Sequence, residues 1–439
     1  MKFYIKTFGC QMNVHDTRRI EEILTRSGHE STTNPAEAQI ALVNSCTIRQ
    51  KPWHKAISET GRLRKGKLKG RSEKDLFVGL VGCVAQQEGE NVFDLLSHVD
   101  FVVSPDNYSQ LPQIINDIVL EKKQVAITGF SEGRAEDFLS IEQVAPNEVS
   151  AFVTIMKGCQ ERCRYCIVPT VRGPERHRSS AQVLEEIQNV VSKGVKEITL
   201  LGQKVNAWKE GNLVFSDLLK MIDKVEGLER LRFTSPHPRH MTADVTDCFG
   251  TLRTLCESIH LPVQAGSNRT LKAMGRRYTR EDYLDVVLRL RSARPEISIS
   301  TDLIIGYPGE TEADFQETLS LIETVGFTSA FSFKFSPRPF TPAEKLDDNV
   351  SEDEKSSRLS RVHEVINRQE MAFRESLRNS ELEVLVEGQG RMDNQLTGRA
   401  RNYQIVNFVS NRPLSEMIGR LVSVRVTEVH PNSLEGELV

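Results

Sequence analysis

The sequence predicts an α/β protein with three parts: an N-terminal parallel α/β domain, a central partial (β/α)6 barrel and a small C-terminal β-barrel. Short apolar runs alternate with amphipathic helical stretches through most of the chain, which indicates parallel sheets. The last part changes to short alternating runs rich in Val, Gly and Asn. The 439 residues also exceed what one hydrophobic core normally supports. We place the domains at residues 1–145, 146–375 and 376–439.

The composition excludes several classes of protein. With 38% hydrophobic and 27% charged residues and a formal net charge of −3, the chain has no overall nucleic-acid signal, so any basic surface must be local. The N-terminus lacks the apolar stretch of a signal peptide, and no run approaches the roughly 20 apolar residues of a membrane span. We therefore expect a soluble, cytoplasmic protein with no membrane partner. We also expect a monomer, although no sequence pattern carries that expectation.

In the first domain, four strand-like runs lie at 3–8, 40–43, 76–81 and 101–103. Helix-like stretches, such as 17–27 and 88–96, lie between them. This alternation is typical of a small parallel sheet. An acidic, polar stretch at 132–150 follows and is interpreted as a linker.

The alternation restarts in the second domain with six strand candidates, at 152–156, 197–201, 231–234, 258–263, 298–305 and 330–335. Helical patterns separate them at 181–192, 216–225, 280–291 and 313–324. Six units are too few for a closed eightfold barrel, so a partial barrel is predicted. A helix at 352–378 then leads to strand-like runs at 382–386 and 421–426, which favour a compact β-barrel.

Cys159, Cys163 and Cys166 form a C-x3-C-x2-C loop directly after the first barrel strand, at the end where β/α barrels place their chemistry. Three thiolates can hold three irons of a 4Fe–4S cube and leave the fourth iron open. S-adenosylmethionine (SAM) can bind such an iron through its amino and carboxylate groups. A structural zinc site usually needs a fourth ligand, and the nearest histidine, His177, lies beyond a Pro–Glu turn.

Three further cysteines, Cys10, Cys46 and Cys83, are spaced by 36 and 37 residues, and each follows a predicted strand. In a parallel sheet these thiols emerge at one edge, where such sheets place ligands. They can hold a second cluster; the alternative is a chance coincidence with strand ends. Cys248 and Cys256 lie in a helix-like stretch and are interpreted as ordinary semi-buried residues.

At these six cysteines the chain resembles the methylthiotransferase family of radical SAM enzymes, nearly from end to end. The resemblance is carried by TFGCQMN (7–13), VNSCTIR (43–49), GLVGCVAQ (79–86), IMKGCQERCRYCIVPTVRG (155–173), LGQKVN (201–206), LPVQAGSNRTLKAMGRRYTRE (261–281), STDLIIGYPGETEADF (300–315), FSFKFSPRPFTPA (331–343) and LTGRARNYQIV (396–406). The final segment resembles the TRAM domain, which is associated with RNA binding. The stretch 326–343, together with HLPVQ (260–264) at the fourth barrel strand, resembles the tRNA-modifying branch of the family.

The resemblance implies addition of a methylthio group to carbon 2 of N6-isopentenyladenosine next to the anticodon. That carbon bears an unactivated C–H bond, so a radical cofactor suits the task. The implied cofactors are two 4Fe–4S clusters and SAM, with sulfur methylated at the Cys10, Cys46 and Cys83 cluster and SAM cleaved at the other. The implied partners are tRNA, a flavodoxin- or ferredoxin-type electron donor, and an iron–sulfur or sulfur donor protein. No acid–base side chain receives a catalytic role.

The resemblance also implies SAM contacts at the ends of the barrel strands, at Gly202, Gln203, Ser235, Gln264, Ile305 and Gly306. The alternative for each is a structural residue of the barrel end. The chain departs from the family's usual Asn, Tyr, Asn and Gly at Gln160, Thr170, Lys204 and Phe340. None of these departures removes a cluster ligand, but Phe340 puts a bulky ring at a flexible turn position.

RNA would need local positive charge. Residues 51–74 carry nine Lys or Arg against two Glu, namely Lys51, Lys55, Arg62, Arg64, Lys65, Lys67, Lys69, Arg71 and Lys74 against Glu59 and Glu73. This run is either a solvated loop or a surface that steers phosphates. In the C-terminal barrel the candidates are Arg399, Arg401 and Tyr403, with stacking possible at the tyrosine.

Two other functions fit part of the pattern. The same chemistry could act on a ribosomal-protein aspartate, or the chain could be a non-catalytic RNA-binding protein stabilised by metal-bound cysteines. RNase-sensitive binding favours tRNA, and a mass gain on a ribosomal protein favours the aspartate. Iron and acid-labile sulfide would exclude the non-catalytic alternative.

Overall fold

The computed structural model describes the whole chain except residues 49, 65–75, 131–137, 139 and 141. The chain forms two compact units: residues 1–143 with 157–161 and 166–176, and residues 144–156 with 162–165 and 177–439. All of the basic run after Arg64, and part of the expected linker at 132–150, lie outside the described residues. Among the described helices, none is both long and apolar enough to cross a membrane.

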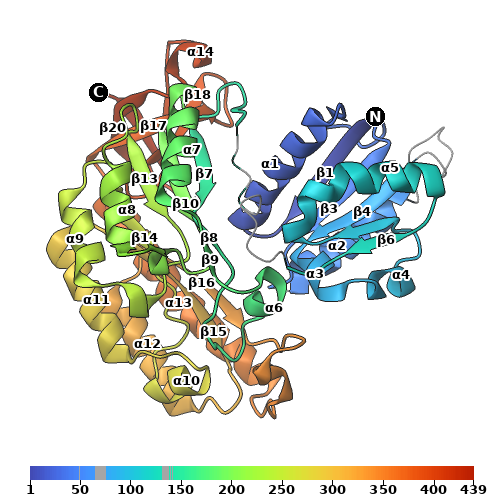
Figure 1. Cartoon of the computed structure of the whole chain (residues 1–439). Coiled ribbons are helices and arrows are strands. Elements are labelled where there is room, and N and C mark those ends of the chain that lie inside the picture. Colours follow the sequence, from blue (N-terminus) through green and yellow to red (C-terminus); the bar gives the residue numbers. More distant parts are fainter. Residues whose placement is uncertain (49, 65–75, 131–137, 139, 141) are drawn as a thin grey trace. The chain divides into compact units, whose positions relative to one another are not determined.

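The first unit contains a six-stranded, all-parallel sheet with the order β2-β1-β3-β4-β5-β6 (Figure 1). The strands are β1 (Lys2–Phe8), β2 (Glu30–Ser31), β3 (Ile40–Ser45), β4 (Phe77–Gly82), β5 (Phe101–Val103) and β6 (Val125–Ile127). The helices are α1 (Gln11–Arg26), α2 (Gln50–Arg64), α3 (Cys83–Glu88), α4 (Asn91–Leu95), η2 (Pro105–Gln110) and α5 (Leu111–Glu121). The predicted parallel α/β fold is confirmed.

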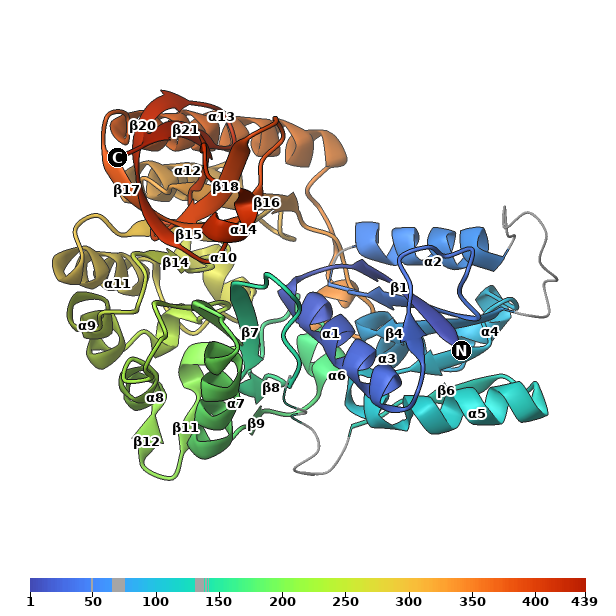
Figure 2. The same cartoon turned by 90° about the horizontal axis from the view of Figure 1, so that it is seen from above.

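Helices cover both faces of this sheet, which is why β3 is buried along its whole length. α1 and α5 pack on one face through residues such as Leu24 and Ile114. α2, α3 and α4 pack on the other through residues such as Leu63, Val84 and Val92 (Figure 2). The helix expected at 88–96 is shorter in the structure, where α4 spans Asn91–Leu95. Gly89, with φ +54°, lies between it and α3.

The second unit contains six parallel barrel strands in two sheets, β13-β10-β7 and β14-β15-β16, with a parallel bridge between Leu231 and Leu255. The strands are β7 (Ser150–Thr154), β10 (Glu197–Leu201), β13 (Arg230–Phe233), β14 (Ser258–His260), β15 (Ser298–Ile305) and β16 (Ser329–Lys334). The larger helices are α7 (Ser180–Ser192), α8 (Phe215–Ile222), α9 (Ala243–Thr251), α11 (Arg280–Ala293), α12 (Glu312–Val325) and α13 (Glu352–Ser376) (Figure 1). The predicted partial (β/α)6 barrel is confirmed.

Short elements lie in the connecting loops. They are β8 (Met156–Lys157), α6 (Val168–Arg172), β9 (Arg176–His177), η4 (Val205–Ala207), β11 (Lys209–Glu210), β12 (Leu213–Val214), η5 (Pro238–His240), α10 (Asn268–Ala273) and η6 (Pro342–Lys345). Cys248 lies in α9 as expected. Cys256 does not lie in a helix, because the chain becomes extended at Leu252. Both thiols are fully buried rather than semi-buried.

The C-terminal strands close into a five-stranded barrel with the order β17-β18-β19-β21-β20 (Figure 2). Its elements are β17 (Glu381–Gln389), β18 (Gln395–Ala400), β19 (Ile405–Val409), α14 (Leu414–Met417), β20 (Leu421–Val429) and β21 (Leu434–Leu438). Closure leaves no long unpaired strand edge. The predicted small β-barrel is confirmed.

The C-terminal barrel docks on the N-terminal ends of the (β/α)6 strands. From β13, Arg230 donates hydrogen bonds to the Glu383 and Arg399 carbonyls at 2.8 and 2.5 Å. Arg232 donates to the Ala400 and Arg401 carbonyls at 3.0 and 2.8 Å. Because the barrel strands are parallel, this contact lies at the opposite end from the loops that carry the expected SAM contacts.

Candidate functional site

The three N-terminal cysteines lie at one edge of the first sheet. β1, β3 and β4 are neighbours, and their last residues align in register. Cys46 and Cys83 each come one residue after their strand, and Cys10 comes two residues after its strand. Parallel strands of matched length therefore carry all three to the same edge.

The three thiols lie close enough to influence one another, and Cys46 interacts with both Cys10 and Cys83. The hydrogen bond from Cys46 lowers the pKa of Cys10 to about 6, against the effect of burial and with help from the Arg172 charge. The same hydrogen-bonding partner lowers the pKa of Cys83, and the two neighbours raise the pKa of Cys46. Three thiols this close form a donor set that fits three corners of an iron–sulfur cube.

Two glycines make room for this convergence. Gly9 has φ +139°, and a Cβ atom there would lie 2.5 Å from the Cβ atom of Cys46. Gly82 has φ +92°, and a Cβ atom there would lie 2.4 Å from the Asn44 side-chain oxygen. A side chain at either position would force neighbouring atoms apart, so both glycines are required by the close approach.

Buried amides hold the first cysteine loop. Asn13 donates a hydrogen bond to the Asn44 Oδ1 atom at 3.0 Å, and Asn44 donates back to the Asn13 carbonyl at 2.8 Å. The Cys10 thiol lies 3.4 Å from Asn13 Oδ1, and the Ile48 N–H donates to the Cys46 sulfur at 3.3 Å. Such secondary contacts orient metal-ligating side chains.

Sequence reasoning missed one residue at this site. The Nε atom of Arg172 donates to the Cys83 sulfur at 3.1 Å, and its Nη2 atom lies 2.7 Å from an Asp16 carboxylate oxygen. Burial opposes ionisation of Asp16, but the Arg172 charge holds its pKa below the usual value. Arg172 lies in the segment 155–173 that contains the second cysteine loop, yet nothing in its spacing links it to Cys83.

The second cysteine loop straddles the two units: Cys159 and Cys166 belong with the first, and Cys163 with the second. The Cys159 N–H donates to the Gly173 carbonyl at 3.2 Å, which closes the loop. At its start Gly158 has φ +75°, and a Cβ atom there would lie 2.0 Å from the Pro174 carbonyl oxygen. This turn therefore demands glycine.

Cys163 receives a guanidinium contact of its own. Arg276 donates to the Cys163 sulfur at 3.4 Å. The neighbouring backbone is tied down as well, because the Arg164 N–H donates to the Met274 carbonyl at 2.9 Å. Hydrogen bonds to cluster sulfurs are a recognised feature of iron–sulfur sites, so the surroundings of Cys163 fit a cluster ligand.

The expected SAM contacts lie at the C-terminal ends of the barrel strands. Gly202 follows β10 in close packing, and a Cβ atom there would lie 2.5 Å from the Met156 Cγ atom. Beside it, the side-chain oxygen of Gln203 is buried and has no hydrogen-bond partner among the described residues. A buried acceptor without a donor fits a ligand that brings an N–H group.

Two more of these residues have unusual backbones. Ser235 and Gln264 have φ values of +59° and +76°, where residues other than glycine are strained. Ile305 ends β15, and the Gly306 N–H donates to a buried Glu310 carboxylate oxygen at 3.0 Å. Strained backbone is common at ligand sites, so Ser235 and Gln264 are compatible with the expected ligand site at these strand ends.

The four residues that differ from the usual family pattern lie in different surroundings. Gln160 is exposed, Thr170 is half-buried in α6, and Lys204 is buried after β10. Phe340 is 67% exposed and has φ +66°. The last residue therefore combines an exposed ring with a left-handed backbone.

The candidate RNA contacts have different surroundings from those expected. Arg401 is engaged at the docking contact, where its guanidinium pairs with Glu257 at 2.8 Å and donates to the Leu255 carbonyl at 3.0 Å. Arg399 lies over the ring of Tyr403 with its Cζ atom 4.5 Å from the centroid, and Tyr403 is 45% exposed.

The basic run is described only up to Arg64. Lys51 and Lys55 are exposed on α2. Arg62 pairs with Glu59, and Arg64 pairs with Asp100. Of these four cations, the two lysines are therefore the better candidates for phosphate contact.

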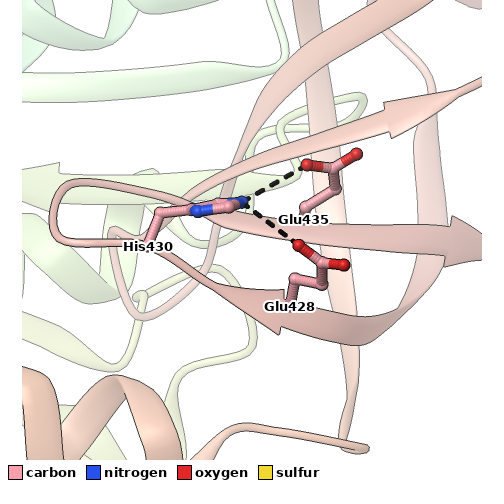
Figure 3. A group of neighbouring side chains, drawn as sticks. All are labelled: Glu428, His430 and Glu435. Atoms are coloured by element: carbon pink, nitrogen blue, oxygen red, sulfur yellow. Dashed lines mark hydrogen bonds and ion pairs between the residues drawn. The ribbon is translucent and has the colours of Figure 1, made fainter.

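Glu428, His430 and Glu435 gather on the hairpin between β20 and β21 (Figure 3). The His430 Nε2 atom lies 3.3 Å from Glu435 and 3.9 Å from Glu428. Contacts between the imidazole and the two carboxylates explain the grouping on this exposed surface, and we assign it no metal.

Known families match each of the three parts of the chain, and known relatives match nearly its whole length. Residues 153–322 match the Radical SAM superfamily, residues 2–104 match the uncharacterized protein family UPF0004, and residues 375–439 match the TRAM domain. The chain is 41% identical to a tRNA-2-methylthio-N(6)-dimethylallyladenosine synthase of Rickettsia rickettsii (strain Sheila Smith), covering 100% of this chain and 99% of the relative. It is 43% identical to a protein of the same name from Geobacter metallireducens, covering 99% and 98%.

Solved structures resemble the fold at low sequence identity. The radical SAM methyltransferase TsrM of Kitasatospora setae, bound to tryptophan and a SAM analogue, matches with a TM-score of 0.59 and 15% identity. The match covers 78% of this chain and 75% of that one. The cobalamin-dependent enzyme OxsB, with aqua-cobalamin and SAM bound, matches with a TM-score of 0.52 and 12% identity over 84% of this chain and 56% of that one.

Proposed function

The chain belongs to the tRNA-2-methylthio-N(6)-dimethylallyladenosine synthase family of radical SAM proteins, and we propose that it adds a methylthio group to carbon 2 of N6-isopentenyladenosine in tRNA, next to the anticodon. The observation that supports this best is the meeting of Cys10, Cys46 and Cys83 at one sheet edge. The same chain carries a separate C-x3-C-x2-C loop. Membership of the superfamily implies one 4Fe–4S cluster and SAM, and the second cluster is part of the proposal.

In this proposal the six cysteines hold two 4Fe–4S clusters, one per triplet. The SAM site is lined by residues of four strand ends, namely Gly202, Gln203, Ser235, Gln264, Ile305 and Gly306. When bound, the clusters and SAM would supply the electron, the radical and the methylated sulfur that acid–base side chains do not provide. The chain's own residues bind and orient: Gln203 accepts a hydrogen bond from the ligand, and Gly306 lets the backbone approach it closely.

The substrate must be presented unstacked, as loop bases of tRNA can be. Lys51 and Lys55 supply positive charge on the helix that follows Cys46. The proposal includes a flavodoxin- or ferredoxin-type electron donor, an iron–sulfur or sulfur donor protein and a cytoplasmic location. It also includes the domain limits 1–145, 146–375 and 376–439.

The decisive experiment is mass spectrometry of tRNA nucleosides from cells that lack this protein. Complementation with the native chain should restore 2-methylthio-N6-isopentenyladenosine, and the Cys46→Ala chain should leave N6-isopentenyladenosine unconverted. Other modified nucleosides serve as internal controls. Unchanged methylthio-adenosine content without the protein would refute the proposal.

Two simple measurements separate the other functions. Anaerobically prepared protein should hold about eight irons with acid-labile sulfide, since each cluster has four. One or two zinc ions would instead support a non-catalytic, metal-stabilised RNA-binding protein. A methylthio mass gain on a ribosomal protein, with tRNA unchanged, would support the aspartate substrate.

A further inference from the structure

Cys83 is contacted by a buried charge that the proposed reaction does not use. Arg172 is 5% exposed, and its Nε atom lies 3.1 Å from the Cys83 sulfur. Burying a guanidinium costs several kcal/mol unless it is paired and hydrogen-bonded. A buried arginine directed at a thiol therefore needs an explanation in terms of what that thiol holds.

The position of Arg172 is fixed by packing. It ends α6, whose Val171 packs with Ile167 and Cys83 in one small apolar cluster. The next residue, Gly173, has φ +74°, and its carbonyl accepts the Cys159 N–H. The guanidinium is therefore held by the same short segment that closes the second cysteine loop.

The guanidinium of Arg172 pairs with Asp16, a carboxylate that also lies near a second arginine. Its Nη2 atom lies 2.7 Å from Asp16, and Asp16 is 3.9 Å from Arg19. Asp16 is on α1, the helix that Cys10 precedes. Asp16 therefore lies near two arginines, and the guanidinium of Arg172 lies beside three thiols that bind metal as anions.

We propose that Arg172 is a positioning residue that sets the reduction potential of the cluster held by Cys10, Cys46 and Cys83. The negative charge of Asp16 shifts that potential in the opposite direction. The inference rests on the proposed function, because it assumes a cluster at that triplet. Net charge and hydrogen bonds to the sulfurs set the potentials of such clusters. The positive charge and the N–H group of Arg172 stabilise the reduced, more negative state, and Asp16 opposes this.

The test isolates one cluster in the full chain. Cys159, Cys163 and Cys166 are all replaced by alanine, the protein is reconstituted with iron and sulfide, and the remaining cluster is titrated by electron paramagnetic resonance. Arg172→Gln should shift the potential to a more negative value, and Asp16→Asn should shift it to a less negative value. Arg176→Lys is the matched control, since Arg176 lies in the same segment but pairs with Asp106 at 2.6 Å.

The outcomes are distinguishable. If the chain without the second triplet binds no cluster, the proposed function fails and this inference fails with it. If the cluster forms but Arg172→Gln and Asp16→Asn both match the Arg176→Lys control, only the inference is overturned. Shifts of the reduction potential with the same sign in both variants would also overturn the inference. A general loosening of the fold could produce such shifts, whereas the proposed charge effect requires opposite signs. If Arg172→Gln does not fold, the sign of the Asp16→Asn shift decides the question.

Discussion

The guanidinium of Arg276 lies 3.4 Å from the Cys163 sulfur, although 113 residues separate the two in the chain. Its Nε atom donates to the Tyr278 hydroxyl at 3.0 Å, and Nη2 donates to the Pro262 carbonyl at 3.2 Å. The Tyr278 hydroxyl in turn donates to the Val263 carbonyl at 2.7 Å. The barrel thus fixes the donor that is aimed at the central cysteine of the loop.

Replacing Arg276 with Met should therefore impair SAM cleavage without removing a cluster ligand. Changes in groups that hydrogen-bond to metal ligands typically cost about 10–100-fold in metal affinity or activity. The measurement is the rate of 5′-deoxyadenosine formation, read together with iron content. Arg277→Met is the control, because Arg277 is exposed. Equal rates in both variants would show that the contact has no role.

Substitutions in the two cysteine triplets should have different effects on SAM cleavage and on methylthio transfer. Cys159→Ala should abolish SAM cleavage, because that loop would bind the cleaved SAM. Cys46→Ala should leave cleavage but stop methylthio transfer, since it removes the middle thiol of the other triplet. Chromatography of 5′-deoxyadenosine and of the tRNA nucleoside product distinguishes them. Loss of cleavage in both variants would contradict this division.

Cys248 and Cys256 should stay unreactive in the folded protein. Burial raises the pKa of Cys248 to about 11 and also raises the pKa of Cys256. The thiolate is the reactive form, so at pH 8 alkylation of Cys248 should be slower than in the unfolded chain by about two orders of magnitude. Its rate should climb as the pH rises toward 11. Mass spectrometry after iodoacetamide treatment checks this, and equal labelling of native and unfolded chains would contradict it.

Phe340→Gly should stabilise the protein. At φ +66° a residue with a Cβ atom is strained by about 1–2 kcal/mol. The ring is 67% exposed, so little apolar burial is lost. After the entropy that glycine adds to the unfolded chain, a gain of about 0.5–1 kcal/mol remains. Urea unfolding measures it, with Asn394→Gly at φ +60° as a control that should gain less, because asparagine tolerates this region. A loss of stability at Phe340 would mean that its ring packs usefully.

The sequence predicted that Cys10, Cys46 and Cys83 lie at one edge of the first sheet, because local patterns determine that placement. Each of the three cysteines follows an apolar run. Because parallel strands place their carboxyl ends at the same edge of a sheet, residues that follow such runs lie close together. The helical patterns predicted from residues 280 and 313 correspond to α11 and α12, which begin at Arg280 and Glu312. In the structure Thr279 and Thr311 cap these helices. The strand β2 was missed because its two residues are too few to show a period. The strand β6 was missed as well, although β5 has the same length of three residues and was predicted.

The charged partners of the cysteines could not be predicted in this way. Arg172 reaches Cys83 across 89 residues, and Arg276 reaches Cys163 across 113. An arginine next to a cysteine motif is usually solvated, and only tertiary packing turns its donors toward a sulfur. Docking of the C-terminal barrel was hidden for the same reason, because Arg230 donates to main-chain carbonyls that carry no sequence signal.

Arg401 should act through that docking contact rather than through RNA. Its guanidinium bonds to both carboxylate oxygens of Glu257 and to the Arg253 and Leu255 carbonyls, so its donors are directed into the protein. Arg401→Ala should destabilise the fold by about 1.5–3 kcal/mol, the usual range for charge-assisted hydrogen bonds. Limited proteolysis after α13 should become faster, while tRNA affinity should change little in filter binding. Arg425→Ala, which breaks an exposed pair with Glu381, should cost less than about 1 kcal/mol. A large loss of tRNA affinity in Arg401→Ala with unchanged stability would instead assign this arginine to the RNA surface.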